Sequence, residues 1–514
     1  MEIDTELQQS IKTIAKGAGI TFTGIIAGNL LGTINQVLLG RFLGVKDYGH
    51  FNLALSVVNI AQAFAIIGLS GGIARFIPFY LKKGEMEMVK STIRFSLRFV
   101  LTASLSIGLI LFLFSKPLAV RIFHDQSSHF MLKVFLLCLP LVVLPSVSQA
   151  IIRAFKAMGY KLLIYDTGMK IVRIVIFIPS ILVGKVVWGA VLSYFGGLFF
   201  ALVSSLAVIR KKLFPRYREY RTIPVAKNLL SFSWPLGLTS LTSLAETRSD
   251  FLFIGYFLSS KEVGIYAPAL VIAQMFAYVS RSFEFIFLPV VSEFYARENK
   301  TQLALVFKSV TKWMFILLLL GLLLIIAFPK EIIILLYGKD YSSGWTALVI
   351  LGIGFAVGSS LNLAGNVLVA AGHTRLSLAS EVIAAIAAIV LDIVLIPLAG
   401  IVGAAIASCS ALILRGLSSL FFAYTTEKIH PFNRDYLKVL AAGGGGLAIA
   451  LGLKFYLSPM LPRLVLMIAV GLILCLTYVG LLFVGRVFDP NDRLVLDAVE
   501  RKTGIKMRFL RRYM

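Results

Sequence analysis

Apolar runs of about 20 residues recur along the whole length of this chain, and this feature restricts its possible folds more than any other. A helix needs a run of that length to cross the roughly 30 Å hydrocarbon core of a bilayer. Hydrophobic residues make up 58% and charged residues 15% of the 514 residues, whereas roughly a quarter of an ordinary soluble domain is charged. We therefore expect an all-α integral membrane protein.

The apolar runs predict fourteen membrane-spanning helices. No cleavable signal sequence opens the chain, so we expect the first run to be retained. The predicted spans are 17–40, 50–74, 95–114, 132–152, 162–182, 186–208, 229–254, 263–290, 313–328, 345–370, 376–397, 402–423, 439–457 and 464–484.

The distribution of charge matters more than the net charge of +25, which in a soluble protein would suggest nucleic acid. Basic residues gather in every second connection, as in "LKKGEMEMVK" (81–90) and "RKKLFPRYREYR" (210–221). The positive-inside rule then places these connections and both termini in the cytoplasm, with the protein in the cell membrane. We expect no nucleic acid partner.

Two phrases recur at a constant offset of 215 residues. "GRFLGVKDYGHFNLAL" (40–55) aligns with "GYFLSSKEVGIYAPAL" (255–270), and "HDQSS" (124–128) aligns with "KDYSS" (339–343). Helices 1–6 and 7–12 are therefore expected to be two copies of one lobe. Because six is even, both copies enter the membrane from the same side, which predicts a parallel repeat of the kind found in transporters with two rocking halves.

The repeat sets the expected domain organisation. It comprises an N-terminal tail (1–16), a first lobe (17–208), a basic linker (209–228), a second lobe (229–424), helices 13 and 14 (425–485) and a basic tail (486–514) that reads as an amphipathic helix on the inner leaflet.

Residues 41–85 carry a recognisable motif. A turn after helix 1 contains Leu43-Gly44, Tyr48-Gly49 and Phe51, and helix 2 ends with Gly68-Leu69, Arg75, Ile77-Pro78 and Tyr80. This stretch resembles the polysaccharide flippases of the multidrug/oligosaccharidyl-lipid/polysaccharide (MOP) exporter superfamily. The resemblance implies a transporter, not an enzyme, which moves oligosaccharides carried on a polyprenyl phosphate or diphosphate from the inner to the outer leaflet.

Helix 1 departs from the cation-coupled drug extruders of the same superfamily. Those proteins commonly carry an acidic residue in helix 1, whereas residues 17–40 contain Asn29, Asn35 and Gln36 but no carboxylate. This difference disfavours a cationic-drug exporter.

Ionisable residues within the predicted spans are the candidate site, because a charge at the bilayer centre is costly and normally faces a cavity or a partner. We predict a cationic cavity for the lipid phosphate and any acidic sugars, since the planar guanidinium fork matches phosphate oxygens. The predicted substrate-binding residues are Arg173, Arg248, Arg281, Arg41, Arg75, Lys170, Arg415 and Asn35.

The alternative for these charges is local pairing. Asp166 and Lys170 are four residues apart on one helical face, as i,i+4 partners are. The other pairs would be Arg281 with Glu284, and Arg248 with Glu246 or Asp250.

Energy coupling is predicted to use an ion gradient. The sequence has no Walker-type loop for ATP, and the candidate groups for H⁺ or Na⁺ coupling are Glu246, Asp250, Glu284 and Asp392. The three cysteines are too scattered for a metal site, so we expect no metal and no cofactor. The expected partners are the lipid-linked glycan and membrane lipids, and a monomer is expected.

Two other functions stay open at this point. One is a drug or small-solute exporter of the same superfamily. The other is a membrane polysaccharide polymerase or ligase, although the outer connections are short and carry no cluster of His, Asp and Glu suited to catalysis.

Overall fold

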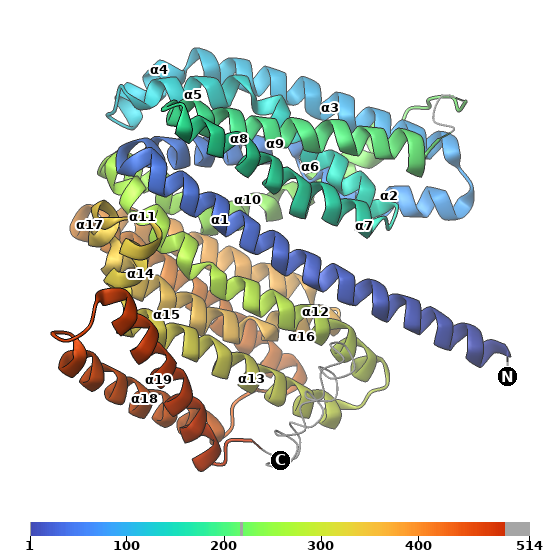
Figure 1. Ribbon diagram of the computed structural model, residues 1–514. Coiled ribbons are helices and arrows are strands. Elements are labelled where there is room, and N and C mark those ends of the chain that lie inside the picture. The colour runs from blue at the N-terminus through green and yellow to red at the C-terminus, as the bar shows by residue number, and fades with distance from the viewer. Residues whose placement is uncertain (1, 216–218, 489–514) are drawn as a thin grey trace. The chain divides into compact units, whose positions relative to one another are not determined.

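The computed structural model describes residues 2–215 and 219–488, of which 88% are helical (Figure 1). The predicted amphipathic tail from Asp489 lies outside the described residues. The α-helices are α1 (Glu2–Ile66), α2 (Leu69–Lys83), α3 (Met86–Leu113), α4 (Ser115–Pro117), α5 (Ser128–Leu137), α6 (Leu139–Ala154), α7 (Met158–Lys161), α8 (Met169–Leu182), α9 (Val186–Val208), α10 (Ala226–Phe257), α11 (Ser260–Ala273), α12 (Met275–Ala296), α13 (Lys300–Ala327), α14 (Pro329–Leu336), α15 (Trp345–Leu361), α16 (Leu363–Ala370), α17 (Thr374–Glu427), α18 (Asp435–Leu457) and α19 (Arg463–Val484). Short π-helical segments η1 (Leu118–Ile122), η2 (Leu162–Gly168) and η3 (Ile209–Leu213) and the 3₁₀ segment η4 (Lys339–Gly344) connect some of them.

The protein is a multi-pass membrane protein. Within the described ranges, nine helices are long and apolar enough to cross a bilayer, or ten if the bent pair α5 and α6 forms one span. Two of these helices are long enough to hold two predicted spans each. α1 breaks at Gly44 (φ 77°) and α17 breaks at Gly400 (φ 60°), between predicted spans in both cases. The total of fourteen stays a prediction.

Breaks within two predicted spans have local causes. α5 and α6 meet at an angle of 48°, just before Pro140, whose ring cannot continue the preceding turn. The predicted span 50–74 is interrupted where Ile67 and Gly68 adopt positive φ, and α2 then runs on to Lys83. The sequence predicted that Arg75 ends a helix, but in the structure Arg75 lies inside α2.

The chain divides into two compact units, which are described separately. The N-unit comprises Ile20–Ala267, and the C-unit comprises Pro268–Met514 together with Met1–Gly19. In the N-unit, α8 packs along α9, and α6 contacts α2, α3 and α9. In the C-unit, α15 packs against α17, α13 contacts α12, α15 and α18, and α18 pairs with α19. α10 falls in the N-unit by contact, although the sequence repeat assigns it to the second lobe. The lobe boundaries stay a prediction, because repeat units and contact units need not coincide.

The two copies of the repeated phrase touch each other inside the N-unit. A Cβ on Gly49 would lie 1.8 Å from the Ser260 carbonyl oxygen, and a Cβ on Gly264 would lie 1.9 Å from the Val45 carbonyl oxygen. Gly264 is Gly49 plus 215, and Ser260 is Val45 plus 215. The contact is thus reciprocal, as a pseudo-two-fold relation between the phrases predicts. Glycine is required at both positions because only a residue without a side chain permits this backbone approach.

Candidate functional site

The first component of the candidate site is the pair Arg173 and Tyr194, which face each other from α8 and α9. The Arg173 guanidinium carbon lies 4.4 Å from the centroid of the Tyr194 ring, a cation–π contact. Gly197 makes room for it, since a Cβ there would be 2.6 Å from the Arg173 Cγ. The Nε of Arg173 is buried and has no hydrogen-bond partner among the described residues. A buried donor of this kind is free to bind a ligand oxygen.

Arg248 of α10 interacts with the same tyrosine through its charge. Tyr194 interacts electrostatically with both Arg173 and Arg248, and Arg248 also interacts with Asp250 and Tyr48. The Arg248 guanidinium carbon lies 5.6 Å from the centroid of the Phe251 ring. Two of the predicted cations, separated by 75 residues in the sequence, therefore both interact electrostatically with one tyrosine, and Arg173 also stacks on its ring.

An aromatic cluster fixes that ring in place. Tyr194 stacks on Phe135 with centroids 5.3 Å apart, and its edge meets Phe51 at 5.8 Å. Nearby in sequence, the Tyr48 hydroxyl donates to the Gln36 side chain at 3.2 Å. Aromatic contacts of this geometry are each worth about 0.5–1.5 kcal/mol beyond their buried area. Sequence reasoning missed Tyr194, because an aromatic residue in an apolar helix usually indicates ordinary core packing.

Three further predicted polar residues are buried in the N-unit, namely Asn35, Glu246 and Asp250. Asn35 and Asp250 are repeat equivalents, and their exposed fractions are 5% and 3%. Asn35 Nδ2 has no hydrogen-bond partner among the described residues, while one Asp250 carboxylate oxygen accepts from the backbone amide of Phe251 at 2.8 Å.

Lys170 is held by backbone and not by the partner the sequence suggested. Its ammonium group donates to the Gly28 carbonyl at 2.7 Å, and Asp166 forms its ion pair with Lys161 at 2.6 Å. Residues 162–168 are π-helical, and π-helical winding brings residues five apart into line. Lys161 therefore replaces Lys170 as the partner of Asp166, which corrects the expected i,i+4 pair.

Arg41 and Arg75 are both exposed. Arg75 stacks on Phe232 of α10, with its guanidinium carbon 4.3 Å from the ring centroid. This contact links α2 to α10 and leaves the polar edge of Arg75 accessible.

The remaining predicted residues lie in the C-unit. Arg281 on α12 is exposed, Arg415 on α17 is half-buried, and Asp392 on α17 is 1% exposed. Glu284 accepts a hydrogen bond from Asn362 Nδ2 at 3.3 Å. No ion pair joins Arg281 to Glu284 within the described part of the chain, so the predicted pairing of these two residues is wrong. The predicted set is thus divided between the two units, and the N-unit holds the convergent part.

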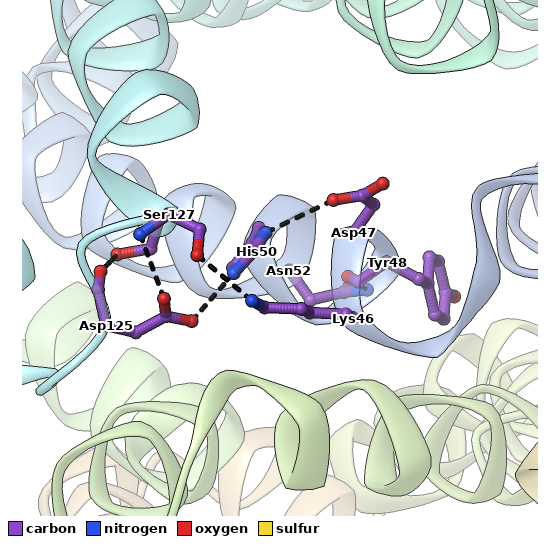
Figure 2. A network of polar contacts seen from close by, with 8 residues as sticks. Lys46, Asp47, Tyr48, His50, Asn52, Asp125 and Ser127 are labelled. Carbon is purple, nitrogen blue, oxygen red and sulfur yellow. Dashed lines mark hydrogen bonds and ion pairs between the residues drawn. The ribbon is translucent and has the colours of Figure 1, made fainter.

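A second polar network joins the first repeated phrase to the segment before α5. Figure 2 shows His50 between Asp47 and Asp125, with ring nitrogen to carboxylate oxygen distances of 3.4 and 2.8 Å. Lys46 donates to the Ser127 hydroxyl at 3.0 Å. The segments "KDYGH" (46–50) and "HDQSS" (124–128) both belong to the internal repeat, but the sequence does not predict that they contact each other.

Asp125 is strongly acidic in this network. Burial opposes its ionisation, but hydrogen bonds from His50 and Ser127 and the charge of His50 outweigh burial and lower the pKa of Asp125 to about 2. His50 is 4% exposed, so the network is a fixed link between the two segments and not a loose surface contact.

Comparisons with known proteins agree with this architecture. The chain is 24% identical over 403 residues to the "Probable low-salt glycan biosynthesis flippase Agl15" of Haloferax volcanii, covering 76% of this chain and 77% of that protein. The lipid II flippase MurJ, in an inward closed conformation, superposes with a TM-score of 0.72 at 16% identity over 90% of this chain and 97% of MurJ. An inward-facing multidrug resistance transporter of the MATE family superposes with a TM-score of 0.64 at 16% identity over 78% of this chain and 94% of the transporter.

The sequence pattern of one family covers more than half of the chain. The match to the family described as polysaccharide biosynthesis protein extends over residues 14–294, which include the repeated phrase, the arginine pair and the aromatic cluster. The similarities to MurJ and to the multidrug transporter show the shared fold. The chain belongs to the polysaccharide biosynthesis protein family.

Proposed function

We propose that this protein flips an oligosaccharide carried on a polyprenyl phosphate or diphosphate from the inner to the outer leaflet. The observation that carries the proposal is the buried Arg173, whose Nε has no hydrogen-bond partner among the described residues and whose guanidinium stacks on Tyr194, with Arg248 interacting electrostatically with the same tyrosine. The flippase relative Agl15 supports the same class of cargo.

The physical reason is the cost of moving a charged headgroup through lipid. A phosphate that leaves water loses its hydration, and in hydrocarbon nothing replaces it. Two guanidinium groups supply fixed donors and positive charge, and arginine stays protonated when it is desolvated. The ring of Tyr194 can hold Arg173 in place without neutralising it, whereas Arg248 contacts the ring of Phe251 and also interacts with Asp250.

The transport cycle is proposed to be alternating access. Two six-helix lobes in parallel repeat, within a fourteen-span protein with both termini in the cytoplasm, would open in turn to each side. The reciprocal contact of Gly49 and Gly264 supports a pseudo-two-fold relation between the two repeated phrases within the N-unit. The working form is proposed to be a monomer in the cell membrane.

Ion coupling is assigned to the buried carboxylates of both units, with Asp250 and Asp392 as the first candidates because they are 3% and 1% exposed. A change in their charge state would bias one conformation over another. Dissipating both the proton and the sodium gradient should slow export. Unchanged export under a protonophore and a sodium ionophore together would exclude this part of the proposal.

Lipid analysis in cells tests the function. Cells that lack the protein should accumulate lipid-linked oligosaccharide, as measured by mass spectrometry of lipid extracts, and the native gene should clear it. Arg173→Gln and Arg248→Gln should each leave accumulation high, since losing one charge-assisted contact weakens binding about 10- to 100-fold. Arg210→Gln, at an exposed site on η3, is the matched control and should restore export.

Two results would contradict the proposal. If both arginine variants, at normal protein levels, cleared the accumulated lipid-linked oligosaccharide fully, the cationic site would have no role in transport. Loss of drug resistance without any accumulation of lipid-linked sugar would instead favour the small-solute exporter, whose fold is the same.

A further inference from the structure

A second cationic pocket lies on the outside of the N-unit, where residues 220–223 pack against the first turns of α3. The pocket encloses about 360 Å³, and Arg94, Arg98, Phe95, Phe99 and Thr222 are among its lining residues. None of its lining residues belongs to the candidate site around Arg173, Arg248 and Tyr194. A role for this pocket therefore does not require the transported cargo to be known.

The two arginines lie one turn apart on one face of α3 and line this pocket. Arg94 donates to the Thr222 hydroxyl at 3.4 Å, while the rings of Phe95 and Phe99 stack beside them with centroids 5.7 Å apart. Within residues 2–215 and 219–488, no ion pair joins either arginine to a carboxylate. Like charges at i,i+4 repel each other, so the site as built favours an anion.

The linker is fixed to α3 by hydrogen bonds and forms one wall of the pocket. The backbone amide of Ile223 donates to the Ser91 hydroxyl at 2.8 Å, and the Lys90 ammonium group donates to the Tyr220 carbonyl. These bonds place Thr222 next to Arg94. The wall is therefore a built feature of the fold and not a loose strand over the helix.

The depth of the pocket in the membrane follows from the sequence of α3. Residues 99–114 carry no charged side chain, and at 1.5 Å per residue they extend about 24 Å into the hydrocarbon. Arg94 and Arg98 precede this run, so they lie at the boundary between headgroups and acyl chains. The positive-inside rule assigns this end of α3 to the cytoplasmic leaflet.

The surface that continues from the pocket faces lipid. Only 22% of the apolar part of α3 is buried inside the protein. Leu101, Leu105 and Leu109 follow Arg98 at helical spacing, and their exposed fractions are 38%, 53% and 61%. A basic pocket followed by an exposed apolar strip matches a molecule with an anionic head and a hydrocarbon tail.

We propose that α3 and residues 220–223 bind the phosphate headgroup of an anionic membrane phospholipid, whose acyl chains lie along the leucine strip of α3. Basic pockets at the cytoplasmic ends of membrane helices recognise acidic lipid headgroups in this way. Since residues 220–223 lead directly into α10, the bound lipid also fixes the chain that enters the helix bearing Arg248.

Lipid titration of the delipidated, full-length protein tests the site. Native mass spectrometry would measure the binding of phosphatidylglycerol and of phosphatidylcholine to the wild type and to Arg94→Gln/Arg98→Gln. We expect the wild type to prefer phosphatidylglycerol, and the variant to lose about 30-fold in affinity for it, since each basic side chain at a membrane surface contributes about fivefold.

A double lysine variant controls for non-specific electrostatic attraction to the lipid. Lys82→Gln/Lys83→Gln removes the same charge from the exposed end of α2 and should change the affinity for phosphatidylglycerol by less than about threefold. Thr222→Val removes the hydroxyl that accepts from Arg94 and should weaken binding by about fivefold. The Thr222→Val variant still tests the lipid site if the double arginine variant does not fold.

Several outcomes would overturn the proposal. Equal losses in both double variants would mean general surface attraction, and unchanged phosphatidylglycerol binding in the arginine and Thr222→Val variants would mean no site. Displacement of phosphatidylglycerol by inorganic phosphate alone would show an anion site without a role for the leucine strip. Preferential binding of polyprenyl phosphate, lost in the arginine variant, would make the pocket a cargo site.

Discussion

Replacing Gly264 by alanine tests the close contact between the two repeated phrases. The added Cβ would lie 1.9 Å from the Val45 carbonyl oxygen, and a backbone oxygen cannot rotate away as a flexible side chain can. The segments would have to separate by about 1 Å to restore an acceptable contact. Overpacking of this kind costs about 1–3 kcal/mol.

The reciprocal geometry makes the prediction more specific. Gly49→Ala should cost about as much as Gly264→Ala, because its Cβ would lie 1.8 Å from the Ser260 carbonyl oxygen. One separation of the two segments relieves both clashes. The double variant should therefore be destabilised by clearly less than the sum of the single variants, a coupling of about 1 kcal/mol.

Denaturant titration of the purified full-length protein in mixed micelles would measure these changes in the free energy of unfolding. Gly159→Ala is the control, because no atom lies within 4 Å of its added Cβ, and it should stay within about 0.5 kcal/mol of the wild type. Wild-type stability in Gly264→Ala, or full additivity in the double variant, would refute the contact as described.

Three further predictions concern the candidate site and the network of Figure 2. Tyr194→Leu should keep the fold but lower flipping about tenfold, as measured by lipid accumulation, because Arg173 loses the ring on which it stacks. Tyr194→Phe keeps the ring and should retain most activity. The pKa of Asp125 is lowered to about 2 from 3.8. Its ionised carboxylate therefore contributes up to about 2 kcal/mol to the free energy of unfolding, a contribution that is fully present above about pH 4 and is lost as the pH falls toward 2. Thermal unfolding between pH 5 and pH 2.5 should therefore show a steeper loss of stability in the wild type than in Asp125→Asn, and parallel curves would contradict the assignment.

The helices were largely predictable because bilayer-spanning segments carry a strong signal. The span predicted at 186–208 has the same bounds as α9, since charged residues flank an uninterrupted apolar run. The spans on either side of Gly44 and Gly400 were also predicted, although each pair lies in one long helix with a local break. The 48° bend between α5 and α6 and the break at Gly68 were not predicted, because a proline or glycine in an apolar run permits a break without fixing whether or how far the helix bends there.

The site was predictable in part. Arg173 and Arg248 stand out as charges within apolar helices, and in the fold both interact electrostatically with Tyr194. The ring itself, Tyr194, has no distinguishing sequence pattern. The partner of Asp166 was predicted wrongly because the i,i+4 rule assumes an α-helix, whereas that segment is π-helical. The link between His50 and Asp125 spans 75 residues and follows from tertiary structure alone.

Flipping by purified protein in vesicles tests the central claim most directly. Proteoliposomes would contain a fluorescent lipid-linked oligosaccharide, and a membrane-impermeant quencher would report its arrival on the outer leaflet. We predict rapid transfer by the wild type and by Arg210→Gln, and at least a tenfold slower rate in Arg173→Gln/Arg248→Gln. Equal rates for the wild type and the double arginine variant would contradict the account.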